Sequence, residues 1–338
     1  MKTTRSGKEK EWTPMSPEVL QVGRYVDVLS DSGFKAVFGD ESNKEILRMM
    51  LNEFLPDGVR IRSMDFSTVE IPGLTMESKG IRIDLRCKGE DGTEFIIEMQ
   101  KYEQDNFFKR CVAYSSRVYD ANLRRLSREE KETIRSRRAI EDMEYDLKPV
   151  YFIALMAVDF AHERPEMWKD RFVSEYTFRE KITGEVVCET ISIIFVELKH
   201  FRKRLEECTD SREEWMYALK NAGSTDKIPE KLTRDGVRKF FEACELAGFS
   251  NGKRQEFETN RMREIDYYSI ISTAKRRGIE KGREEGRKEG REEGEVTGRE
   301  KGRAEMTLEL AKTMKAKGMS TADIAEITGL TEQAIENL

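Results

Sequence analysis

Two acidic side chains, Asp84 and Glu98, stand in the stretch IRIDLRCKGEDGTEFIIEMQ, which runs from Ile81 to Gln100. Apolar and polar residues alternate on both sides of Gly92, a pattern typical of two half-buried strands joined by a turn. A three-residue loop, with the glycine in the left-handed conformation, matches apolar residues with apolar ones across the hairpin. The same register sets Asp84 directly opposite Glu98, with Cβ atoms about 5 Å apart.

This register makes three further predictions about which side chains face each other. The expected apolar pairs are Ile83 with Met99, Leu85 with Ile97 and Cys87 with Phe95. Because like charges directly opposed repel, the two acids need a positive group between them. A divalent cation such as Mg²⁺, held by hard oxygen ligands, is the simplest candidate. The alternative is a solvent-facing hairpin in which Arg82 and Arg86 flank the acids.

The segments around the hairpin predict an α/β fold, in which helices cover a mixed sheet. A helix is expected from Ser42, with Ser42 and Glu45 forming a capping box and Pro56 beyond its end. Another is expected over 104–126. We also expect strands at 59–70, at the continuously apolar run 149–160 and at 190–201, and helices over 212–247. The core-facing stripe expected on the 104–126 helix comprises Phe107, Phe108, Cys111, Val112, Ser115, Val118, Tyr119 and Leu123.

Glycines recur at every fourth residue from Gly278 to Gly302, among charged residues of both signs. Each glycine costs about 1 kcal/mol against alanine inside a helix, so the repeat should form a marginal helix or a semi-flexible spacer. Small residues four apart also permit close helix contact, which leaves self-association open. The last segments, 321–327 and 331–338, outline a helix-turn-helix around Gly329. The second lacks Arg and Lys, so packing or dimerisation is favoured over DNA reading.

Composition excludes several classes of protein. The 338 residues carry a net charge of −5, so DNA contacts must come from a local basic face. Two histidines, and five cysteines without zinc-finger spacing, argue against a His- or Cys-based metal centre. No apolar leader and no run of about 18 apolar residues is present, so we expect a cytoplasmic protein without membrane association.

An Asp on one strand, followed by E-x-Q on the next and then by a basic helix, resembles the PD-(D/E)XK nucleases. The chain is more closely similar to the Rpn family of recombination-promoting nucleases, also described as PD-(D/E)XK nuclease family transposases. The segments that carry this resemblance are SDSGFKAVFGDESNKEILRMMLNEFL, IDLRCKGEDGTEFIIEMQ, RCVAYSSRVYD, LKPVYFIALMAVDF, IIFVELKHF and EEWMYALKNA, together with the glycine-repeat tail. It implies a restriction-endonuclease-like core and a magnesium-dependent DNA endonuclease linked to recombination or transposition.

The resemblance implies catalytic roles for Asp84, Glu98 and Gln100, with Mg²⁺ held by Asp84, Glu98 and either the backbone carbonyl of Met99 or water. Gln100 stands where the wider superfamily places a lysine, and glutamine cannot neutralise developing charge.

Several further residues are candidates for supporting roles. Arg110, Arg117 and Arg124 recur every seven residues along the next helix and could bind DNA phosphates, or form an ordinary solvated face. In the family segment DSGFK, Asp31 is a candidate accessory residue and Lys35 a candidate DNA contact. Glu197 also matches the family, although nothing in the sequence places it near the metal.

We therefore expect five regions: a flexible 1–22, a nuclease-like domain over 23–205, a helical extension over 206–272, the repeat over 273–305 and a helical pair over 306–338. The first functional hypothesis is a metal-dependent endonuclease acting on DNA. The second is a non-catalytic DNA-binding or assembly protein that oligomerises through its C-terminal helices, which Gln100 favours. A retaining glycosidase is a weaker third, because the sequence shows no sugar-stacking cleft.

Overall fold

A computed structural model describes residues 23–71, 80–129, 148–158, 160, 165–168 and 171–338. The predicted flexible segment 1–22 lies outside these residues. The chain divides into two compact units, 1–265 and 266–338. The predicted boundaries of the five regions remain predictions.

The first unit is built on a six-stranded mixed sheet with the order β1-β4-β5-β6-β8-β7. Its strands are β1 (Met64–Phe66), β4 (Leu85–Gly89), β5 (Glu94–Gln100), β6 (Val150–Met156), β7 (Val173–Arg179) and β8 (Val186–Glu197). Strands β5, β6 and β8 are parallel, and the outer pairings are antiparallel. Two short strands, β2 (Glu70–Ile71) and β3 (Ile81–Arg82), pair separately. The α/β class with a mixed sheet flanked by helices is confirmed.

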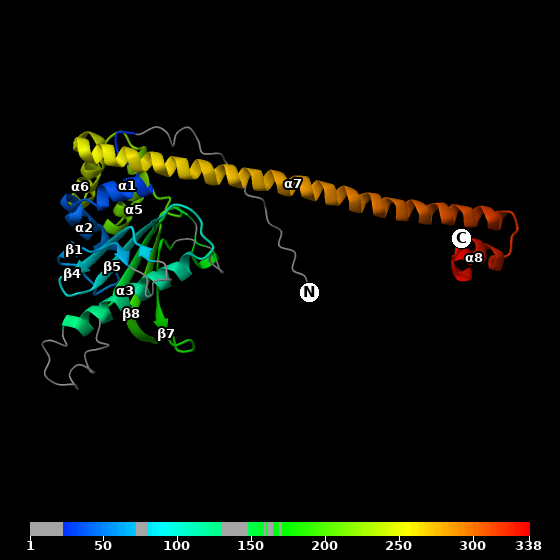
Figure 1. Cartoon of the computed structure of the whole chain (residues 1–338), viewed down its shortest axis with the longest axis horizontal. Helices are drawn as coiled ribbons and strands as arrows, with labels where there is room; N and C mark the ends of the chain where they lie inside the picture. Colours follow the sequence, from blue (N-terminus) through cyan, green and yellow to red (C-terminus); the bar gives the residue numbers. More distant parts are fainter. Residues whose placement is uncertain (1–22, 72–79, 130–147, 159, 161–164, 169–170) are drawn as a thin grey trace. The chain divides into compact units, whose positions relative to one another are not determined.

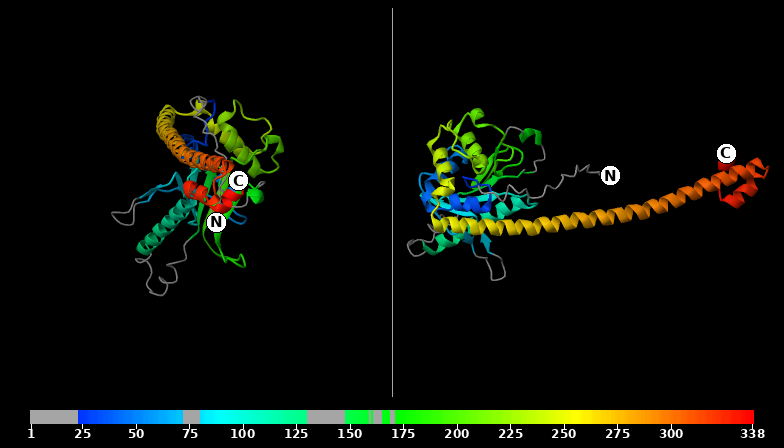
Figure 2. Two further views of the ribbon diagram at one scale, coloured as in Figure 1. Left: turned by 90° about the vertical axis from the view of Figure 1, so that its right-hand side faces the viewer. Right: turned by 90° about the horizontal axis from the view of Figure 1, so that it is seen from above.

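Helices cover both faces of this sheet (Figures 1 and 2). One face packs on α3 (Phe107–Glu129), which contributes Phe107, Cys111 and Val118 to the core. The other face packs on α1 (Asp31–Phe38), α2 (Lys44–Phe54), α5 (Ser211–Asn221) and α6 (Asp235–Cys244). All seven residues of β6 are buried, as the apolar run predicts. The sheet therefore has two cores, one on each face.

The hairpin between β4 and β5 confirms part of the predicted register. Leu85 pairs with Ile97 and Cys87 with Phe95, and Gly92 has φ +89. The pairing of Ile83 with Met99 is wrong, because the Ile83 amide donates instead to the Val69 carbonyl. The chain leaves the β4–β5 ladder at Asp84.

The positive φ of Gly92 gives a test of the hairpin. An alanine there has to adopt the left-handed conformation, at a cost of about 1–2 kcal/mol. We expect Gly92→Ala to lower the free energy of unfolding by that amount in a denaturant titration. Gly248→Ala is the matched control, because Gly248 has an ordinary φ and a Cβ added there would meet no atom within 4 Å. Equal effects of the two substitutions would contradict the predicted turn.

Three other local predictions are wrong. The capping box fails because the Ser42 amide and hydroxyl donate to Asp40 instead, and α2 begins at Lys44. Of the strand expected over 59–70, Met64–Phe66 is β1 and Glu70 begins β2. Val112 is 39% exposed, so it does not belong to the core stripe on α3.

The C-terminal helix α7 spans Asn251–Ala316 and contains the glycine repeat in helical form. It is followed by α8 (Thr321–Thr328) and α9 (Glu332–Glu336). In the second unit Ala311 of α7 packs with Ile324 and Ile335 in a small core. The end of α7 therefore packs on the two predicted helices as a third helix. Among the described residues no helix is both long and apolar enough to cross a membrane.

Candidate active site

Asp84 and Glu98 lie together at the end of the β4–β5 hairpin. The Asp84 amide donates to Glu98 Oε1 at 3.1 Å, and Asp84 Oδ2 accepts from the Met99 amide at 3.1 Å. These reciprocal bonds continue the strand pairing where the backbone ladder ends. Asp84 and Glu98 therefore lie next to each other, as predicted. Their carboxylates accept hydrogen bonds from backbone amides of the opposite strand, where carbonyl groups would accept them in a regular ladder.

Both acids are largely buried rather than solvent-facing. The side chain of Asp84 is 19% exposed and that of Glu98 is 7% exposed. The predicted flanking role of Arg86 is also absent, because Arg86 pairs with the buried Glu94 at 3.0 Å. The alternative of a solvent-exposed hairpin is therefore wrong.

Two cations reach the acids from opposite sides of the sheet. Lys35 Nζ on α1 lies 3.3 Å from Asp84 Oδ1 and 2.6 Å from Asp31 Oδ1. Arg110 Nη2 on α3 lies 3.4 Å from Glu98 Oε2 and donates to Gln100 Oε1 at 3.0 Å. Side chains of α1 and α3 thus provide positive charge beside the two opposed acids.

Gln100 has both ends of its amide engaged. Its Oε1 accepts from Arg110 and its Nε2 donates to the Tyr102 carbonyl. Gln100 is 4% exposed, so the amide is held in one orientation beside Glu98. The guanidinium of Arg110 also lies 5.0 Å from the ring centre of Phe107, which fixes it against α3.

Burial raises the pKa of both carboxyl groups. Burial first, and then repulsion from Asp84, raises the pKa of Glu98 to about 8, against the opposing effect of Arg110. Burial likewise raises the pKa of Asp84, which Lys35 opposes. For Lys35, burial acts to lower the pKa, but Asp84 and Asp31 outweigh it and the net shift is upward. Near neutral pH the pair therefore tends to hold a proton that a metal ion would displace.

This pKa predicts a pH-dependent cost in stability. A carboxyl with a higher pKa in the folded than in the unfolded chain loses stabilisation as pH rises from about 4.5 to about 8. We expect Glu98→Gln, with chelator present, to unfold at nearly the wild-type temperature at pH 5. At pH 8 the variant should be more stable by on the order of 2 kcal/mol. Thermal unfolding followed by circular dichroism measures both, and an identical difference at the two pH values would contradict the shift.

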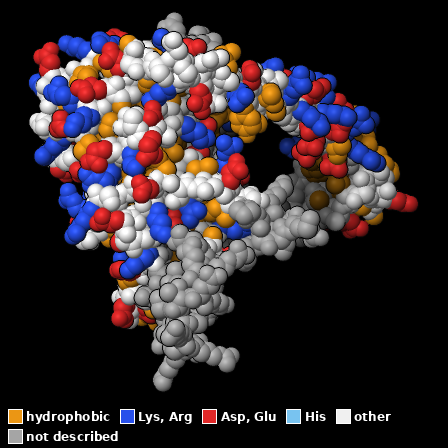
Figure 3. Space-filling view, turned by 60° about the vertical axis from the view of Figure 1, so that its left-hand side comes forward, with side chains coloured by type: hydrophobic (Ala, Val, Ile, Leu, Met, Phe, Trp, Pro, Cys, Tyr) orange, Lys and Arg blue, Asp and Glu red, His pale blue; other side chains and the backbone are white. Residues whose placement is uncertain are grey.

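The other predicted residues are placed as follows. Arg117 lies on α3, half-buried, and Arg124 lies on α3 with its side chain outside the described residues. Glu197 ends β8, two strands from β5, with the Ser174 hydroxyl at 3.5 Å and His200 Nε2 at 3.7 Å. On the face seen in Figure 3, basic and acidic side chains intermingle without a broad basic patch.

The sequence did not predict the contribution of Glu264. From α7 within the first unit, Glu264 Oε2 accepts from the Ser32 amide and hydroxyl, at 3.3 and 2.9 Å. Its Oε1 lies 3.7 Å from Lys101 Nζ, so Lys101 points away from Gln100 as expected. No periodic pattern signals this contact, because it joins residues that are 232 positions apart.

The carboxylate oxygens of Asp84 and Glu98 are of the kind that a hard divalent cation binds. Among the described residues no group of three or more His, Cys, Asp or Glu side chains is placed to hold a metal. Mg²⁺ is usually bound by one or two carboxylates together with water and substrate phosphates, so two carboxylates suffice.

Comparison with known proteins gives one finding. The family model described as PD-(D/E)XK nuclease family transposase matches residues 28–274. Neither the curated proteins nor the solved structures contain a match to the chain.

Proposed function

This chain belongs to the PD-(D/E)XK nuclease family transposases, and on that premise we propose that it is a Mg²⁺-dependent DNA endonuclease acting in recombination or transposition. The observation that carries the proposal is the reciprocal bonding of Asp84 and Glu98 at the end of the hairpin. Two buried acids with raised pKa values, each contacted by a cation, are an arrangement typical of functional sites.

In this proposal Asp84, Glu98 and the backbone carbonyl of Met99 hold the metal ion. Bound Mg²⁺ supplies a Lewis acid that polarises the scissile phosphate and lowers the pKa of the attacking water. Asp84 and Glu98 bring negative charge to the site, and their burial excludes bulk water from it. Asp31 acts through Lys35, which it holds beside Asp84.

Arg110 takes the role that a lysine has in the wider superfamily. Gln100 lacks a charge but accepts a hydrogen bond from the Arg110 guanidinium, which keeps that cation beside Glu98. A fixed guanidinium can donate two hydrogen bonds to phosphate oxygens and stabilise developing charge. Lys35 offers a second cation from the α1 side, and Arg117 and Arg124 extend the contact to flanking DNA phosphates.

The test is cleavage of supercoiled plasmid by the full-length protein. We expect nicked plasmid in Mg²⁺, none in chelator, and none with Glu98→Gln in Mg²⁺. Cleavage that persists with Glu98→Gln would show that another site acts. DNA binding without any nicking would favour the non-catalytic assembly protein instead.

We also propose that the C-terminal helices form a homo-oligomer. A Cβ added at any repeat glycine from Gly278 to Gly302 would meet no atom within 4 Å, so each glycine leaves room for close approach of a second helix. The molecular mass in solution of the full chain should exceed that of one chain, and a chain ending before Gly278 should be monomeric. Equal oligomeric states would refute self-association through this segment.

A further inference from the structure

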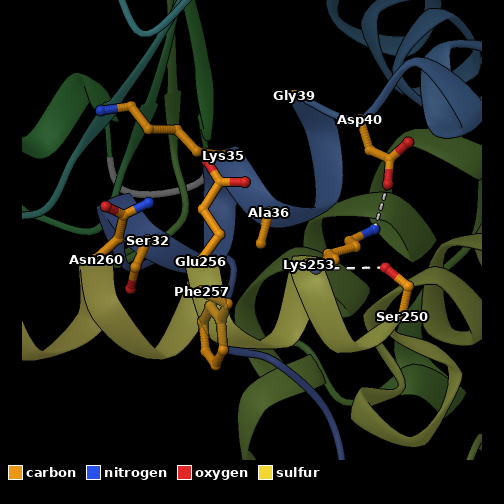
Figure 4. A pocket seen from close by; sticks show the side chains of 10 residues that line it. All are labelled: Ser32, Lys35, Ala36, Gly39, Asp40, Ser250, Lys253, Glu256, Phe257 and Asn260. Carbon is orange, nitrogen blue, oxygen red and sulfur yellow. Dashed lines mark hydrogen bonds and ion pairs between the residues drawn. The ribbon is translucent and has the colours of Figure 1, made fainter.

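A pocket of about 300 Å³ lies between α1 and the first turns of α7, within the first unit (Figure 4). Ala36 and Lys35 line it from α1, and Glu256, Phe257 and Asn260 line it from α7. This volume is at the lower end of the range for small-molecule sites. None of the roles proposed above uses this space.

Most of the charged groups on its lining are paired. Lys253 Nζ lies 2.6 Å from Asp40 Oδ2 and 4.4 Å from the ring centre of Phe249, so its charge is already neutralised. The remaining charged groups are Lys35, whose side chain leads away from the pocket toward Asp84, and Glu256 (Figure 4). Glu256 therefore leaves the pocket with a net negative charge, which disfavours a free anion.

The polar and apolar groups suit a flat heteroaromatic ring. Asn260 and Glu256 rise from α7 toward α1 (Figure 4). Together they offer an amide donor, an amide acceptor and a carboxylate acceptor. Phe257 also lines the pocket, and its side chain is 4% exposed. Amide and carboxylate side chains are the groups that hydrogen-bond the edges of nucleobases, and apolar side chains pack on their faces.

The pocket adjoins the candidate active site through a single residue. Lys35 lines the pocket, and its ammonium group lies 3.3 Å from Asp84 Oδ1. One lysine side chain thus extends from the pocket lining to Asp84. A paired base cannot leave the helix stack without losing its partner, whereas an unpaired base pays little to do so.

We propose that this pocket receives one unpaired nucleotide of the DNA substrate, next to the phosphate that is cleaved. This inference rests on the proposed function and deepens it: the preferred substrate is DNA with an unpaired or distorted position. Asn260 and Glu256 bind the edge of the base, and Phe257 packs on the base.

The experiment measures binding without cleavage. Fluorescence anisotropy of the full chain in Ca²⁺, without Mg²⁺, compares a labelled duplex with the same duplex carrying one extra unpaired nucleotide. We expect the bulged duplex to bind about tenfold more tightly. Ala36→Phe, which fills the pocket without removing a charge, should make the two affinities equal. Ala36→Ser is the matched control, and should keep the preference because the space remains open.

Thermal unfolding checks that Ala36→Phe is folded, and Asn260→Ala, which removes only the amide, gives a second variant expected to reduce the preference. Equal binding of both duplexes by the wild type, no binding of either, or a preference that survives in both variants would overturn the pocket assignment. Plasmid nicking separates the two proposals. Nicking without a bulge preference overturns the pocket alone, whereas a bulge preference without nicking overturns the nuclease alone.

Discussion

Asp84→Asn is expected to abolish Mg²⁺-dependent nicking of plasmid DNA. The substitution keeps the shape of the side chain and an acceptor for the Met99 amide, but removes the charge that would hold the metal ion in the proposed site. A metal ion contributes several kcal/mol to phosphoryl transfer, and each 1.36 kcal/mol is tenfold in rate. The cleavage rate should therefore fall by about a thousandfold or more.

Two controls make this result specific to the metal. Asp31→Asn removes a neighbouring acid that contacts Lys35 rather than Glu98, and should leave measurable activity. Thermal unfolding should show that Asp84→Asn is at least as stable as the wild type, because burial opposes the charge on Asp84. Retention of near wild-type nicking by a folded Asp84→Asn protein would remove this residue from the site.

Arg110→Gln is expected to reduce the rate constant for cleavage by about 10²- to 10³-fold, the typical effect of losing one preorganised donor to a developing charge. The apparent affinity for DNA should change much less, because one phosphate contact among many is lost. Arg110 also lowers the pKa of Glu98, so its removal should shift the pH at which Mg²⁺ activates cleavage upward.

Arg117→Gln is the matched control, since it removes the same charge from the same helix two turns further on. It should weaken DNA binding modestly and leave the pH profile unchanged. If both variants lose activity only through DNA affinity, Arg110 belongs to a phosphate-binding stripe and not to the chemistry. Arg110→Lys should recover part of the rate, because a lysine restores the charge without the forked geometry.

Strong local patterns predicted the central part of the fold. The alternation around Gly92 and the loop length fixed the pairing of Leu85 with Ile97, because a one-residue slip would turn every apolar side chain to the wrong face. The apolar run of β6 is buried on both faces, as expected of a strand in the parallel part of a sheet that helices cover on both sides.

The wrong predictions arose where another hydrogen-bond partner competes with the predicted one. Ser42 has the residue type of a helix cap, but Asp40, two residues earlier, accepts from both its amide and its hydroxyl. Ile83 follows the strand alternation, yet its amide bonds to Val69 of another segment. Val69 lies in another segment, outside the range of a strand pattern, whereas Asp40 is a local competitor that the Ser-x-x-Glu pattern does not include.

In the candidate site, too, the local pattern was predicted and the contacts from other elements were not. The hairpin register predicted that Asp84 and Glu98 lie together, whereas the cations that contact them come from α1 and α3. The sequence left Arg110 and Lys35 between DNA contact and a role at the site, because a basic residue on a helix has no local sign of which carboxylate it will contact. Contacts between distant elements, such as Glu264 with Ser32, follow from the packing of the whole unit.

The most direct test is the position of a bound divalent ion. Crystals of the full chain soaked in Mn²⁺ and measured at the manganese absorption edge should show one anomalous peak contacting carboxylate oxygens of both Asp84 and Glu98. Glu98→Gln crystals treated in the same way should lose that peak. A wild-type map without a peak between these two side chains, or with Mn²⁺ bound only elsewhere, would contradict the account.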